Sequence, residues 1–117
     1  MNRFRCKGAR GEREFCHKLR EAGFTHAVRS RQFCGTPLSP DILTPGLAFA
    51  HFEVKFQNRS APWNVDEWQA KAEREAGAEK IAIVAHRRSR RPWLVTMSLK
   101  DLLHILRFAD VEALNHG

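Results

Sequence analysis

The clearest pattern along the chain is an alternation of apolar and polar side chains that begins near Phe49 and ends at Gln57. Successive residues of a β-strand point to opposite faces, so the segment is expected to be a strand with one face in a hydrophobic core. The apolar face holds Phe52, Val54 and Phe56. The other face carries His51, Glu53, Lys55 and Gln57, so an acid and a lysine lie side by side on a largely apolar strand.

Start and stop signals divide the rest of the chain into helices and strands. Gly23 ends a run of helix formers, and Ser98-Leu99-Lys100-Asp101 resembles a capping box. We expect helices at residues 8–22, 65–76 and 99–108, and strands at residues 24–33, 41–44, 49–57, 80–86 and 91–97. This α-β-β-β-α-β-β-α order predicts an α/β fold, a mixed sheet flanked by helices, in one domain that covers residues 1–117.

The first predicted helix carries an acid on its apolar side. Glu12, Cys16 and Leu19 fall at positions i, i+4 and i+7, so they share one stripe of the helix. Glu14 and Glu21 point elsewhere. We therefore expect Glu12 to face the core or a cleft.

The chain is strongly basic, with a formal net charge of +7. Nine of its Lys and Arg residues lie in residues 1–31, and four arginines lie in residues 87–91. Such a surface suits a polyanionic partner, of which nucleic acid is the first candidate. A solvated basic face without a partner is the alternative.

Composition also bears on the compartment. No apolar run approaches the roughly 20 residues that a membrane span needs, and no apolar segment follows the basic N-terminus. The three cysteines are irregularly spaced and form no zinc pattern. We expect free thiols, no membrane partner and a cytoplasmic, intracellular location, with a phage-encoded origin left open.

Asp41 brings a further acid toward the polar face of the central strand. It follows Pro40, and a hairpin between its strand and residues 49–57 would place it beside Glu53 and Lys55. If Glu12 joins them, three carboxylates converge, and they repel unless a divalent cation lies among them. Oxygen ligands without Cys or His favour Mg²⁺ or Mn²⁺ over zinc. Lys55 would then orient or deprotonate water, or stabilise the transition state of phosphodiester hydrolysis.

At these residues the sequence resembles a known superfamily. Pro40-Asp41 followed by Glu53-Val54-Lys55 resembles the PD-(D/E)xK nuclease signature. The segment from Lys7 to Phe15, with its Lys-Gly and Glu-Arg-Glu, is similar to the opening of archaeal-type Holliday junction resolvases. Gly23-Phe24 and Val28-Arg29-Ser30 resemble the next strand of the same family.

The resemblance implies a restriction-endonuclease-like αβββαβ core and a homodimeric, Mg²⁺-dependent endonuclease, with Mn²⁺ able to substitute. Such an enzyme makes paired cuts in four-way DNA junctions during DNA recombination and repair. The implied metal ligands are Glu12, Asp41, Glu53 and the Val54 backbone carbonyl, and Lys55 is the implied catalytic lysine. Arg29 would meet substrate phosphate, and either Ser30 or Ser39 is the functional serine of the loop before the aspartate. The DNA-binding residues that we expect are Arg3, Arg5, Lys7, Arg10, Arg29, Ser30, Arg31, Ser39, Arg87, Arg88, Arg90 and Arg91.

Two alternatives share the expected fold. One is a PD-(D/E)xK endonuclease that acts on flaps, branched DNA or duplex DNA. The other is a DNA-binding module that has lost catalysis. The leucine stripe of the last predicted helix is expected to pack in the core, with part of a dimer interface as the second interpretation.

Overall fold

The computed structural model describes residues 3–30 and 40–109, and within them the chain forms an α/β domain with a five-stranded mixed sheet. The order of elements is the expected one. The helices are α1 (Arg3–Glu21), α2 (Val65–Ala76) and α3 (Leu99–Arg107), with a 3-10 turn, η2, at Pro45–Leu47. The strands are β1 (Val28–Arg29), β2 (Ile42–Leu43), β3 (Ala50–Gln57), β4 (Ile81–Arg88) and β5 (Leu94–Thr96).

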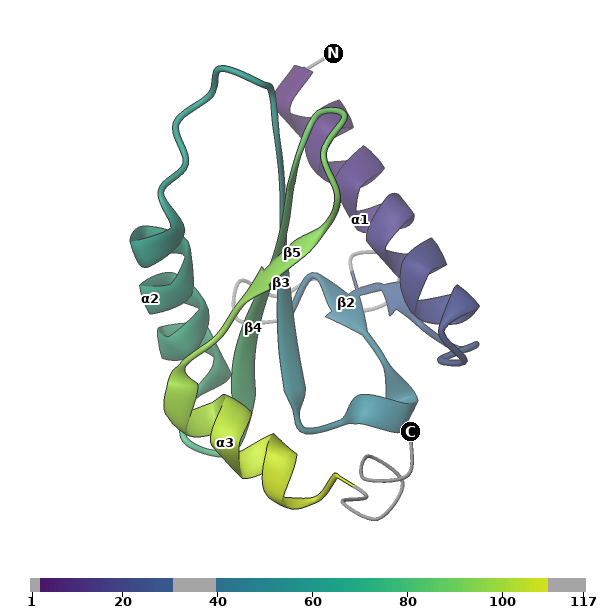
Figure 1. The fold of residues 1–117 in the computed structure, drawn as a ribbon. Helices are drawn as coiled ribbons and strands as arrows, with labels where there is room; N and C mark the ends of the chain where they lie inside the picture. Colours follow the sequence, from purple (N-terminus) through teal and green to yellow (C-terminus); the bar gives the residue numbers. More distant parts are fainter. Residues whose placement is uncertain (1–2, 31–39, 110–117) are drawn as a thin grey trace.

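The five strands lie in the sheet in the order in which they occur along the chain. β1, β2 and β3 pair antiparallel, β3 and β4 pair parallel through the crossover helix α2, and β5 returns antiparallel at the edge. In the parallel pair, Glu53 lies beside Val84 and Lys55 beside His86. Figure 1 shows α1 and α2 on opposite sides of the sheet.

The two faces of β3 are those that its alternation predicts. On one face, the rings of Phe52 and Phe15 of α1 lie edge to face with centroids 5.4 Å apart. On the other face, His51 approaches Glu75 of α2. α1 therefore covers the apolar face of β3, and α2 covers the face that carries Glu53 and Lys55.

Two clusters of buried side chains hold the layers together. The first lies under α1, and its largest members are Phe15, Ile42 and Phe52. The second lies under α2, where Ala72 packs on Ala82 and Val84. Small side chains on both sides of this second cluster let α2 approach the sheet closely.

Several element boundaries differ from those predicted. α1 begins at Arg3 rather than at residue 8, because the basic N-terminal residues contain no helix breaker. β1 holds only Val28 and Arg29, because the Ala27 amide bonds to the Phe24 carbonyl at 3.2 Å and closes a turn in place of the first part of the predicted strand. Residues 31–33 of that prediction lie outside the described residues.

The two end signals read from the sequence are confirmed. Gly23 has a φ of 109°, a conformation that glycine adopts without a steric penalty. The Ser98 side chain accepts a 3.1 Å hydrogen bond from the Asp101 amide at the start of α3. None of the described helices is long and apolar enough to cross a membrane.

Candidate active site

Asp41 is hydrogen-bonded to the central strand on both sides of Glu53. Its backbone amide donates to the Phe52 carbonyl at 2.8 Å, and its Oδ2 accepts from the Val54 amide at 2.8 Å. The hairpin that the sequence analysis expected therefore brings Asp41 to the strand that carries Glu53 and Lys55. A carboxylate held by a backbone amide has a fixed position, which a catalytic acid requires.

Ser30 fixes the chain just before Asp41. Its hydroxyl donates to the Pro40 carbonyl, and its backbone amide donates to the Asp41 carbonyl at 3.0 Å. Ser30 is buried, so in this structure it supports the aspartate instead of facing solvent. Ser39, the other candidate serine, and Arg31 lie outside the described residues.

Glu53 lies in a cluster with His51 and Glu75 on the α2 side of the sheet. Its Oε1 lies 3.0 Å from His51 Nε2, and the same nitrogen lies 3.7 Å from Glu75 Oε2. One ligand atom from each of the three residues lies within 4.8 Å of the other two. The side chains of His51 and Glu53 are buried, and that of Glu75 is only 13% exposed.

Glu12 is buried as expected, with 3% of its surface exposed, but it lies with a different group. Its Oε1 accepts a hydrogen bond from Arg29 Nε at 2.9 Å, which ties α1 to β1. α1 covers the apolar face of β3, whereas Glu53 points to the face under α2. In the described part of the chain, Glu12 and Asp41 do not belong to the group of ligand atoms within 4.8 Å, so their role as metal ligands stays a prediction.

Lys55 lies beside an aromatic cluster. Its neighbour on β4 is His86, whose ring meets Trp63 and Trp68 with centroids 4.8 and 6.1 Å away. His86 Nε2 pairs with the Thr96 hydroxyl at 2.8 Å. Burial lowers the pKa of His86, because the charged imidazolium loses its water in this setting. The ring is therefore a neutral packing group.

Two arginines of the segment 87–91 bind the protein itself. Arg87 bridges Glu14 of α1 and the Arg91 carbonyl, and Trp93 Nε1 donates to the same Glu14 at 2.9 Å. Arg88 stacks on Trp63 at 4.3 Å and donates to the Ala61 carbonyl at 2.9 Å. These guanidiniums stabilise the loops at one end of the sheet, so direct DNA contact from them stays a prediction.

The remaining basic candidates differ in their surroundings. Arg90 and Arg91 are exposed at the turn between β4 and β5, where Arg90 adopts a φ of 65°. The Arg10 guanidinium lies over the Phe56 ring, 5.1 Å from its centroid. The side chains of Arg3, Arg5 and Lys7 lie outside the described residues, although the backbone there is helical.

Glu75 is the residue of this site that sequence reasoning missed. It lies three residues after Ala72 and one before Ala76, at the margin of the apolar stripe of α2. The sequence of α2 contains several other acids, and only the packing of the helix on the sheet shows which one turns toward β3. The signal that was available was the placement of His51 on the same face as Glu53.

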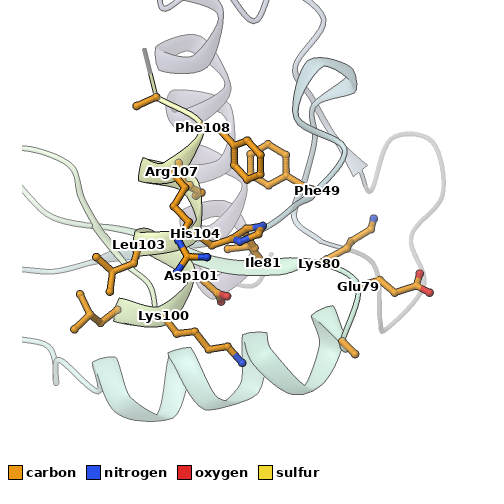
Figure 2. A pocket seen from close by; sticks show the side chains of 14 residues that line it. Phe49, Glu79, Lys80, Ile81, Lys100, Asp101, Leu103, His104, Arg107 and Phe108 are labelled. Atoms are coloured by element: carbon orange, nitrogen blue, oxygen red, sulfur yellow. The ribbon is translucent and has the colours of Figure 1, made fainter. Parts of the chain in front are cut away.

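A large hollow lies away from Asp41 and Glu53. It has a volume of about 1220 Å³ and separates α3 from the start of β4. Figure 2 shows Phe49, Ile81 and His104 among the side chains around it, and neither Asp41 nor Glu53 lines it. Two leucines of α3, Leu99 and Leu103, line it and are exposed.

No family model, curated protein or solved structure matches this chain. What the site does is therefore inferred from its own residues.

Proposed function

We propose that the protein is a metal-dependent, structure-selective DNA endonuclease that resolves four-way junctions by phosphodiester hydrolysis. The proposal rests mainly on the two hydrogen bonds that join Asp41 to β3, one on each side of Glu53. Lys55 lies two residues after Glu53 on the same strand. The order of elements supports it as well. α1, the antiparallel strands β1 to β3, the crossover helix α2 and the parallel strand β4 follow the αβββαβ order of a restriction-endonuclease-like core.

The donor set suits a hard cation. Asp41 and Glu53 supply carboxylate oxygens, and the Val54 carbonyl lies in the same strand, so these groups are of the kind that Mg²⁺ or Mn²⁺ binds. When bound, such an ion supplies Lewis-acid activation of the phosphate and of a water nucleophile. Lys55 contributes a positive charge against the charge that builds on the phosphate. Arg29 orients Glu12 through their ion pair and offers its guanidinium to an adjacent phosphate.

The surface fits a polyanion bound by two copies of the chain. The net charge of +7 and the exposed Arg90 and Arg91 supply attraction to the DNA backbone. Paired cuts in a symmetric junction need two active sites, so we propose a two-fold homodimer. The exposed leucines of α3 offer it an apolar interface.

The proposal is tested by cleavage of a labelled four-way junction and of the matching linear duplex in Mg²⁺. We expect the junction to be cut in pairs and the duplex to be left intact. Asp41→Asn keeps the size of the side chain but removes its charge, so the cleavage rate should fall on the order of 10²-fold or more. Lys55→Ala should act in the same direction, with junction affinity changed less than about threefold because phosphate contacts dominate binding.

Asp66→Asn, an exposed acid on α2, is the matched control and should cleave at the normal rate. Equal cutting of junction and duplex would instead identify a general endonuclease of the same chemistry. Binding without cleavage in either Mg²⁺ or Mn²⁺ would identify a DNA-binding module.

A further inference from the structure

We propose that His51, Glu53 and Glu75 form a binding site for a divalent transition-metal ion, which shares Glu53 with the proposed oxygen-ligand site of Asp41. The proposal does not depend on nuclease activity. It rests on three side chains from two elements, the strand β3 and the helix α2, that converge beneath the helix.

The spacing of the three atoms is that of ligands around one ion. Bonds of about 2.0–2.2 Å to nitrogen and oxygen place neighbouring ligands of a four-coordinate ion about 3.4 Å apart. His51 Nε2 lies 3.0 Å from Glu53 Oε1 and 3.7 Å from Glu75 Oε2, and these two separations bracket that value. The ligand atoms of Glu53 and Glu75 lie within 4.8 Å of each other, so a bound ion would draw the two carboxylates together.

The charges around the cluster favour a cation. Two carboxylates lie within 4.8 Å of one imidazole, and the side chains of His51 and Glu53 are 2% and 8% exposed. Lys71 lies 3.8 Å from the other oxygen of Glu75, but its side chain is 54% exposed and well solvated. Buried carboxylates are costly unless they are compensated, and a divalent ion compensates both.

The imidazole selects the class of ion. A nitrogen ligand with two carboxylates suits Zn²⁺, Mn²⁺ or Co²⁺ better than Mg²⁺, which prefers oxygen ligands and retains its water. Glu53 faces this group through Oε1. The ion would therefore hold Glu53 rigidly under α2, next to the strand position that Asp41 grips.

The test titrates the full-length chain with Mn²⁺ and follows the bound ion by electron paramagnetic resonance. We expect pulsed spectra to show nitrogen coupling from a coordinated imidazole, and Zn²⁺ to displace the Mn²⁺ where Mg²⁺ does not. His51→Gln should abolish the nitrogen coupling. Glu75→Gln, whose side chain is less buried and whose shape is kept, should weaken the binding of this nitrogen-coupled Mn²⁺ at least tenfold.

Glu67→Gln on the exposed face of α2 is the matched control and should bind as the unmodified protein does. His17→Gln removes the exposed His17–Glu21 pair, the rival surface chelate, and should also leave the signal unchanged. Unaltered binding in Glu75→Gln, persistence of the nitrogen coupling in His51→Gln, or its loss in His17→Gln would overturn the proposal.

Asp41→Asn separates this site from the proposed function, because it should retain the nitrogen-coupled ion while it loses cleavage. Nitrogen-coupled Mn²⁺ in a protein that cuts no DNA would leave the metal site standing without the nuclease. Junction cleavage in a protein without that signal would support the nuclease and refute the metal site.

Discussion

At the scale of single residues, the sequence shows which face of a helix or strand each acid occupies, but not which of these faces lie together in the fold. The sequence alone put Glu12 on the buried stripe of α1 and Glu53 on the polar face of β3, because both follow from simple periodicities. It did not show that these stripes lie on opposite sides of the sheet. Periodicity fixes a face of each element, whereas the packing of α1 and α2 decides which faces meet.

Gly11 gives a sharp test of the contact between α1 and β3. A Cβ at Gly11 would lie 2.8 Å from the Cβ of Phe56, an atom that cannot swing away because it is attached to the strand backbone. Gly11→Ala should therefore lower the free energy of unfolding by about 1–3 kcal/mol, despite the higher helix propensity of alanine. Urea denaturation measures the change.

Gly8 on the same helix is the matched control, because a Cβ there would meet nothing within 4 Å. Gly8→Ala should raise the free energy of unfolding by up to about 1 kcal/mol. Equal shifts in both variants would contradict the close approach of α1 to the sheet.

At the scale of elements, β2, β3 and α2 were predicted to within one residue at each end, whereas the start of α1 and the first part of the strand predicted at residues 24–33 differ. β3 and α2 carry strong periodic patterns, and the predicted α2 matches the observed Val65–Ala76. β1 and β2 have two residues each, and strands that short exist only because they pair with their neighbours. The hairpin that brings Asp41 to Glu53 was predicted, but its register depends on such contacts.

α3 was expected to pack in the core, with part of a dimer interface as the second interpretation. The structure contradicts the first interpretation, and the second stays a prediction. Of its apolar side chains, Leu99 is 69% exposed and Leu103 is 50% exposed, and Leu102 and Leu106 are exposed too. None of its residues is buried. An amphipathic helix with its apolar face in water is a candidate for association with a second copy.

Disruption of that face tests the homodimer. Leu103→Lys together with Leu106→Lys places two charges on the apolar side of α3 and should raise the dimer dissociation constant at least tenfold. Sedimentation velocity over a range of concentrations measures it. Lys100→Ala, on the exposed polar side, should not change it, and an unmodified protein that is monomeric at all concentrations would refute the dimer.

At the scale of the whole molecule, stability depends on pH through a buried ring. Burial lowers the pKa of His86, so the unfolded chain takes up a proton at a higher pH than the folded chain does. The contribution of this neutral ring is therefore fully present above the ordinary histidine pKa of 6.5 and is lost as the pH falls toward the lower folded value.

We expect the free energy of unfolding to fall between pH 7.5 and pH 5.5, with His86 adding a slope of at most about 1.4 kcal/mol per pH unit. His86→Gln should flatten this dependence even if it also lowers stability at pH 7.5. Urea denaturation at a series of pH values gives the slope. His26→Gln, at an exposed position, should leave the slope as it is, and an unchanged slope in His86→Gln would exclude a contribution of the ring.

The parallel pairing of β3 with β4 has a kinetic consequence. Glu53 and Lys55 acquire their neighbours Val84 and His86 only after the intervening chain, with α2 in it, has closed as a loop. Loop closure costs entropy before the new contacts repay it, so pairings between distant segments form slowly. During synthesis, the hairpin that places Asp41 beside β3 can form as soon as β3 has emerged. The strand β4, which pairs with β3 next to His51 and Glu53, emerges only later. In a nascent chain, Asp41 and Glu53 can therefore come together before β4 has paired with β3.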